Sequence, residues 1–209
     1  MHEDQIRVAA YFLVVLNPFS QALFLWDLMR SNGSRGFASI YARASLLSGG
    51  VYALFALTGE FLFIEVFQVR IDAFRIFGGL IVFIISVRYF TGEGGAAQFF
   101  RGKASEIAAS ISIPFMVGPA TIWVSILIGR SLPTPLDVVT IAGILLANFA
   151  LVCGMQVLVR RFNGSRESLL GSYMAILMRT NALFIGAIGI EMVLAGLEGV
   201  GAIPGSRTP

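Results

Sequence analysis

Two helix-breaking dipeptides, Asn17-Pro18 and Gly118-Pro119, interrupt apolar segments of this chain. A proline inside a helix removes a backbone donor and clashes with the carbonyl one turn earlier, so the helix kinks or ends there. A half-helix that begins after each proline would direct backbone N–H groups towards a carboxylate, and the residues before it would offer carbonyls to a cation or an amino group. These are the two ends of a zwitterionic amino acid. A simple proline kink is the alternative interpretation.

Polar side chains near the breaks are candidates to line the same site. Asn17, Ser20 and Gln21 lie within about one turn of the first break, and Thr121 follows the second. Asn148 lies near the middle of a later apolar segment, and Asn181 is a weaker candidate. Each polar side chain could equally form an interhelical hydrogen bond, worth about 0.6 to 2 kcal/mol in membranes. The predicted substrate-binding residues are Asn17, Pro18, Ser20, Gln21, Gly118, Pro119, Thr121 and Asn148.

Three of the charged residues within apolar segments are functional candidates, because a charge there is expensive unless it finds a partner or reaches the headgroups. Arg75 and Arg179 occupy matching positions in the two halves of the chain and are candidate gate or scaffold residues. We expect Arg75 to extend to the headgroups and Arg179 to have a buried partner. Glu191 is the candidate for coupling to a proton or sodium ion, although exposure at the interface explains it equally well.

The elements that must position these residues are membrane spans. The chain has 209 residues, of which 56% are hydrophobic and only 13% charged, with a mean hydropathy of +0.82. Soluble domains carry about 25% charged residues. A bilayer span takes about 20 mostly apolar residues, and six segments qualify: 6–29, 42–64, 70–91, 107–129, 136–159 and 173–197. We therefore predict an all-α integral membrane protein.

The spans divide into two halves of three, residues 1–95 and 96–209, separated by a polar connector that is rich in glycine. An odd number of spans in each half makes the second half enter the membrane from the opposite side. Pro119 lies 101 positions after Pro18 (119 − 18), and Arg179 lies 104 positions after Arg75 (179 − 75). Because both pairs occur in the same order, we predict two inverted repeats, each beginning with a broken helix.

The basic residues indicate the orientation in the membrane. They do not form a stripe, which argues against nucleic acid as a partner. Nine basic residues lie in or beside the connectors that follow spans one, three and five, which all face the same side of the membrane. They are Arg30, Arg35, Arg43, Arg88, Arg101, Lys103, Arg160, Arg161 and Arg166. Five lie on the other side, namely Arg7, Arg70, Arg75, Arg130 and Arg207. The positive-inside rule then places both termini outside the cytoplasm.

The sequence shows no constellation typical of an enzyme. His2 is the sole histidine and lies outside the first span, and Cys153 is the sole cysteine. A Ser-His dyad or a histidine-ligated metal site within the membrane cannot be assembled from these residues. The phosphate-binding pattern Gly-x-x-x-x-Gly-Lys does not occur. We expect neither an enzyme nor a bound metal or cofactor.

Three motifs carry a resemblance to a known family. They are Asn17-Pro18 followed by Ala-Leu-Phe-Leu at 22–25, Phe-Arg-Ile-Phe-Gly-Gly-Leu-Ile-Val at 74–82, and Pro-Phe-Met-Val-Gly-Pro-Ala-Thr-Ile at 114–122. On these residues the chain resembles, over nearly its whole length, the MarC family of bacterial inner-membrane proteins, which includes members described as neutral amino acid transporters. The resemblance implies a six-helix transporter fold with inverted repeats, and small neutral amino acids such as glycine or alanine as substrates. Ala120 and Ser20-Gln21 depart from the family pattern, which leaves the choice of substrate open.

The combined interpretation is a secondary transporter. We expect the two broken helices to meet at the bilayer midplane, bind a small neutral amino acid and expose it alternately to the two sides. A non-transporting membrane subunit or modulator, which would use the breaks to pack against a partner, remains an alternative, and so does a narrow channel. The sequence is also compatible with a homo-oligomer.

Overall fold

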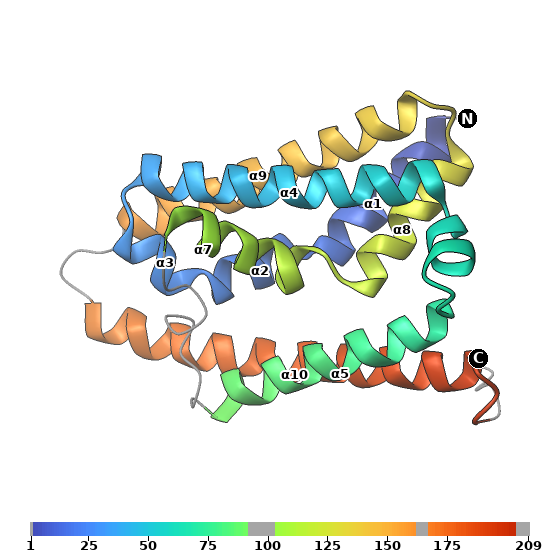
Figure 1. Ribbon diagram of the computed structural model, residues 1–209. Coiled ribbons are helices and arrows are strands. Elements are labelled where there is room, and N and C mark those ends of the chain that lie inside the picture. Colours follow the sequence, from blue (N-terminus) through green and yellow to red (C-terminus); the bar gives the residue numbers. More distant parts are fainter. Residues whose placement is uncertain (1, 92–102, 162–166, 204–209) are drawn as a thin grey trace.

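The computed structural model describes residues 2–91, 103–161 and 167–203, and every regular element in these ranges is helical. Figure 1 shows the arrangement. The first half comprises α1 (His2–Leu16), α2 (Pro18–Phe24), α3 (Trp26–Ser31), α4 (Ser34–Thr58), the short π-helix η1 (Leu62–Val66) and α5 (Ile71–Thr91). The second comprises α7 (Ala104–Ser110), the π-helix η2 (Ile111–Met116), α8 (Pro119–Ser131), α9 (Leu136–Arg161) and α10 (Glu167–Gly199).

Five stretches of the described chain are long and apolar enough to cross a membrane. They are Ile6–Phe24, Ser34–Thr58, Ile71–Thr91, Leu136–Arg160 and Ile176–Gly199. The prediction of an all-helical membrane chain is confirmed. The remaining predicted span, residues 107–129, is divided among α7, η2 and α8, and each of these is shorter than the roughly 20 residues that cross a bilayer.

Both predicted breaks interrupt a helix. At the first, α1 ends at Leu16 and Asn17 adopts a left-handed conformation (φ 50°, ψ 70°) that asparagine tolerates better than most residues. At the second, Val117 and Gly118 are extended, with φ/ψ of −90°/105° and −136°/172°. Pro18 and Pro119 then occupy the first position of α2 and α8, where the missing N–H of proline costs nothing.

The helices form layers around the two breaks. The long helices α4 and α9 pack together on one face, and α5 and α10 form an antiparallel pair on the opposite face (Figure 1). The broken segments, α1–α2 and α7–α8, lie between these two layers. The centre of the molecule is therefore occupied mainly by the two broken segments.

Small residues bring α5 and α10 into close contact. A Cβ atom on Gly79 would lie 2.5 Å from the carbonyl oxygen of Gly189, and one on Gly186 would lie 2.6 Å from the hydroxyl of Ser86. Helices in lipid associate through such close backbone approach because the hydrophobic effect does not drive them together there. The two helices therefore form one tightly packed pair.

Candidate functional site

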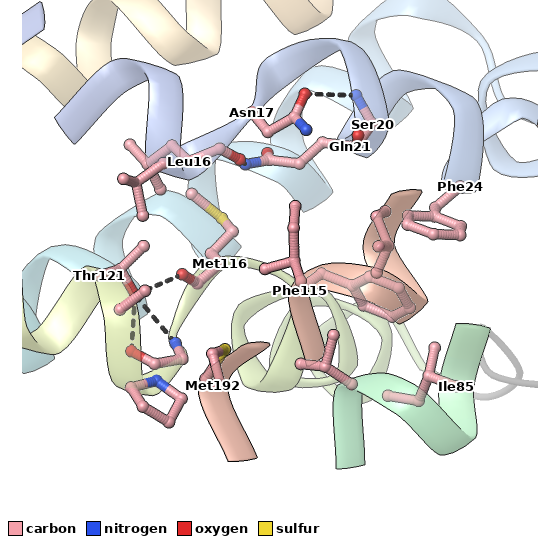
Figure 2. A pocket seen from close by; sticks show the side chains of 17 residues that line it. Leu16, Asn17, Ser20, Gln21, Phe24, Ile85, Phe115, Met116, Thr121 and Met192 are labelled. Carbon is pink, nitrogen blue, oxygen red and sulfur yellow. Dashed lines mark hydrogen bonds between the residues drawn. The ribbon is translucent and has the colours of Figure 1, made fainter. Parts of the chain in front are cut away.

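The two breaks line one cavity of about 140 Å³, shown in Figure 2. Asn17, Ser20 and Gln21 contribute from the first break, and residues 118–121 contribute from the second. The opposite wall is aliphatic, with Val82 and Ile85 of α5 and Ile185, Ile188 and Met192 of α10. Six of the eight predicted binding residues therefore share this cavity. Pro18 is not among its lining residues, and Asn148 reaches it only through Gln21.

Side chains satisfy much of the backbone at the first break. The Oδ1 atom of Asn17 accepts a hydrogen bond from the Ser20 N–H at 3.1 Å, which caps α2 (Figure 2). The Nε2 atom of Gln21 donates to the carbonyl oxygen of Leu16 at 2.6 Å. The expectation of an open N–H group and an open carbonyl is therefore wrong for these two groups, because the polar residues beside the proline bind them.

The second break is held by the hydroxyl of Thr121. The Thr121 hydroxyl accepts from the Gly118 N–H at 2.9 Å and lies 3.0 Å from the Met116 carbonyl oxygen and 2.9 Å from that of Gly118. The Tyr52 hydroxyl also donates to the Met116 carbonyl, at 2.5 Å. Gly118 has no side chain that could cap α8, so the N–H groups of the first turn, at Ala120 and Thr121, are not capped by the N-cap residue. Both residues line the cavity.

A buried network supports the first break from behind. The Tyr41 hydroxyl donates to Oε1 of Gln21. The Nδ2 atom of Asn148 donates to the Tyr41 hydroxyl at 2.7 Å and lies 3.3 Å from the same Gln21 oxygen. The three side chains are buried and join α2, α4 and α9. Asn148 therefore acts on the cavity through Gln21.

Sequence reasoning missed Tyr41. A buried tyrosine hydroxyl requires a hydrogen-bond partner, but the sequence does not show which amide in the other helices provides it. Asn181, ranked low among the candidates, is also closer to the site than expected: the Ser20 hydroxyl donates to its Oδ1 atom at 2.9 Å and so links α2 to α10.

The three predicted charged residues lie outside the cavity lining. Arg75 is half-buried, with Nη1 at 3.4 Å from a carboxylate oxygen of Asp72 and its guanidinium 5.3 Å from the ring centroid of Trp123. It therefore has two protein partners, and its extension to the headgroups stays a prediction. Arg179 and Glu191 are exposed on α10. The expectation of a buried partner for Arg179 is wrong, because its side chain lies on the outer surface of that helix.

Aromatic rings border one end of the cavity. Phe24 and Phe115 line it, and their ring centroids lie 5.3 Å apart. Tyr89, near the end of α5, packs edge-on against Phe24 with a centroid separation of 4.3 Å. The three rings come from α2, η2 and α5, so they join the broken segments to the α5–α10 pair.

Comparisons with known proteins agree on one family. A family model described as MarC family integral membrane protein matches residues 3–200. The chain is 26% identical over 202 residues to a UPF0056 membrane protein of Pyrococcus horikoshii, covering 96% of each chain. It is 24% identical over 207 residues to one of Aquifex aeolicus, covering 92% of each, and 24% identical over 206 residues to YvbG of Bacillus subtilis, covering 93% of this chain and 94% of the relative. No solved structure matches.

Proposed function

We propose, since the chain belongs to the MarC family of integral membrane proteins, that it is a secondary transporter of small neutral amino acids such as glycine or alanine in the cell (inner) membrane. The observation that carries the proposal is that two helix breaks, far apart in the sequence, line one cavity. Transporter sites are typically formed where discontinuous helices meet at the interface between repeats.

The size and polarity of the cavity support a small zwitterion as substrate. A cavity of about 150 Å³ in another protein holds benzene, which has six heavy atoms, and alanine also has six. The uncapped N–H groups of Ala120 and Thr121 suit a carboxylate. Asn17 and Ser20, on the other side of the cavity (Figure 2), offer oxygen acceptors to the ammonium group. The aliphatic wall accommodates a short side chain.

The proposed transporter crosses the membrane six times, with α7, η2 and α8 together forming the sixth crossing. The start of α1 and the end of α10 lie at the same end of the molecule (Figure 1), as an even number of crossings requires. The positive-inside rule places that end outside the cytoplasm. Residues 1–95 and 96–209 are the proposed inverted repeats.

Reciprocal packing between the halves supports this repeat. In the first half, α2 contacts α9 and α10 of the second half. In the second half, α8 contacts the corresponding helices of the first, α4 and α5. Such an exchange is what a two-fold axis in the membrane plane would produce. On this scheme Arg75 is a scaffold residue, because its contact with Trp123 joins α5 to α8.

Counterflow in proteoliposomes tests the proposal. Liposomes that contain the purified protein and unlabelled alanine should accumulate labelled alanine or glycine above the level of empty liposomes, with a proton or sodium gradient applied in turn to identify the coupling ion. Uptake no better than that of empty liposomes across a panel of small neutral amino acids would refute transport.

The same experiment separates the alternatives. A narrow channel would pass the amino acid without the acceleration that trapped substrate gives a carrier. A non-transporting subunit would give no amino acid flux above that of empty liposomes. It would also copurify with a second protein in fixed stoichiometry.

A further inference from the structure

A second and larger cavity, of about 530 Å³, lies between η1, α5 and the second break. Its lining consists only of apolar residues and glycine, and it includes five phenylalanines: Phe55, Phe63, Phe67, Phe74 and Phe77. It shares Val82, Gly118 and Pro119 with the first cavity, the one lined by both breaks. The two cavities therefore lie on either side of the start of α8. The proposed substrate site does not use this space.

The shape of this phenylalanine-lined cavity follows one stripe of α5. Phe74, Phe77, Gly78, Ile81 and Val82 are spaced as i, i+3, i+4, i+7 and i+8, which places them on a single helix face. From first to last they cover about 12 Å at 1.5 Å per residue. One leaflet contributes about 15 Å to the hydrocarbon core of a bilayer. The cavity therefore extends over most of the depth of one leaflet.

The cavity opens on the outer surface of a membrane-spanning helix. Phe67, Phe77 and Ile113 in its lining are 59%, 64% and 63% exposed, whereas Phe63 and Ile122 are buried. In a bilayer the exposed residues of this region contact hydrocarbon. A molecule that enters from the lipid would pass the exposed residues before it reaches the buried ones.

A basic residue lies beside the mouth. Arg70 directly follows Val69 of the lining and is exposed, with Nη2 at 2.7 Å from the Gly199 carbonyl oxygen and 3.6 Å from a carboxylate oxygen of Asp72. These contacts hold the guanidinium near the start of α5, where that helix meets the membrane surface. An arginine in this position attracts a phosphate group.

The backbone at the second break tolerates hydrocarbon on this side. The Val117 N–H donates to the Ser112 carbonyl oxygen at 2.8 Å, and the Gly118 N–H donates to the Thr121 hydroxyl. The Gly118 carbonyl accepts from the Ile122 N–H at 2.9 Å. Because these groups have partners, an apolar neighbour breaks none of their hydrogen bonds. The residues with uncapped N–H groups, Ala120 and Thr121, line the other cavity.

We propose that the phenylalanine-lined cavity binds one acyl chain of a bilayer phospholipid, whose phosphate contacts Arg70. The acyl chain runs along α5, and its end contacts Gly118 and Pro119. Bound lipid therefore fills the space behind the wall that separates the two cavities. This role does not depend on the identity of the transported substrate.

Photolabelling in proteoliposomes tests the proposal. The probe is a phospholipid with a diazirine near the end of one acyl chain, and the labelled residues are mapped by peptide mass spectrometry. We expect label on buried Ile122 or Phe63. Ile81→Trp, which fills the cavity, should lower that label at least about fivefold, whereas Leu80→Trp, on the exposed face of the same helix, should retain it. Arg70→Gln should lower it about fivefold, because the phosphate loses a charged hydrogen-bond donor.

Three results would overturn the proposal: label confined to exposed residues such as Phe67 and Phe77, label unchanged by Ile81→Trp, or label displaced by millimolar leucine or phenylalanine. The last would assign the cavity to the side chain of an amino acid. If Ile81→Trp is not monodisperse in detergent, Ile113→Trp blocks the exposed mouth without altering a buried position and tests the same point.

Discussion

Removing the Thr121 hydroxyl should disorganise the second break. Thr121→Val keeps the shape of the side chain but removes the acceptor of the Gly118 N–H and one donor to the Met116 carbonyl. Tyr52 still satisfies that carbonyl, so the main loss is the partner of one partly buried N–H. Leaving such a group unpaired costs about 1 to 3 kcal/mol in soluble proteins, and interhelical hydrogen bonds measured in a membrane average about 0.6. We expect a loss of about 1 to 2 kcal/mol.

This loss should appear as weaker substrate binding. The Thr121–Gly118 hydrogen bond holds the extended turn that directs the first N–H groups of α8 at the cavity. If the turn is ordered in only a fraction of molecules, the apparent affinity falls by that fraction. About 1 to 2 kcal/mol corresponds to a fivefold to thirtyfold higher Kd for alanine, measured by calorimetry or by scintillation proximity on the purified protein.

Ser125→Ala is the matched control. Ser125 lies one turn further along α8, is buried, and donates its hydroxyl to the Ile122 carbonyl oxygen at 2.7 Å, but it does not line the cavity. Its loss should change the Kd less than about twofold, because that carbonyl already lies within the helix. Wild-type affinity in Thr121→Val, or an equal loss in Ser125→Ala, would contradict the reasoning.

Three further substitutions test the surrounding structure. Asn17→Ala removes the cap on the Ser20 N–H and should raise the Kd for alanine about fivefold, whereas Asn17→Asp, which keeps an acceptor, should preserve the cap; calorimetry on both variants checks this. Tyr41→Phe removes one buried hydroxyl and should lower stability by about 1 kcal/mol, seen as a lower Tm in detergent; an unchanged Tm would show that the network contributes no stability. Gly79→Leu should abolish monodisperse protein in size-exclusion chromatography because its side chain would meet the backbone of α10, whereas Gly50→Leu, which has open space around its Cβ, should elute normally; equal elution of both would refute close packing at that position.

The sequence was informative about the breaks because their cause is local. A proline cannot donate a backbone hydrogen bond in any context, and the chain is interrupted at Asn17 and at Gly118, directly before Pro18 and Pro119. Polar side chains within one turn of these points were also found from sequence, since a short stretch of chain keeps them close. Six of the eight predicted binding residues accordingly line the cavity.

The errors concern long-range contacts. Arg75 and Arg179 match in sequence, yet Arg75 lies over Trp123 and beside Asp72 while Arg179 is exposed. The sequence shows how deep a charge lies in its own helix but not which helix packs against it. The side chains that bind the Leu16 and Met116 carbonyls were also unforeseen, because hydrogen bonding of a break depends on residues around it in space.

Hydropathy and the two prolines by themselves determined that this is a helical membrane protein with interrupted segments, since both properties act over a single turn or a single span. Only the tertiary structure decided that the interruptions share one cavity, that Tyr41 and Asn148 hold Gln21, and that a second cavity lies behind Gly118. These features depend on which helix faces interdigitate. That choice is made by close packing of side chains in three dimensions, which hydrophobic periodicity within any one apolar segment does not encode.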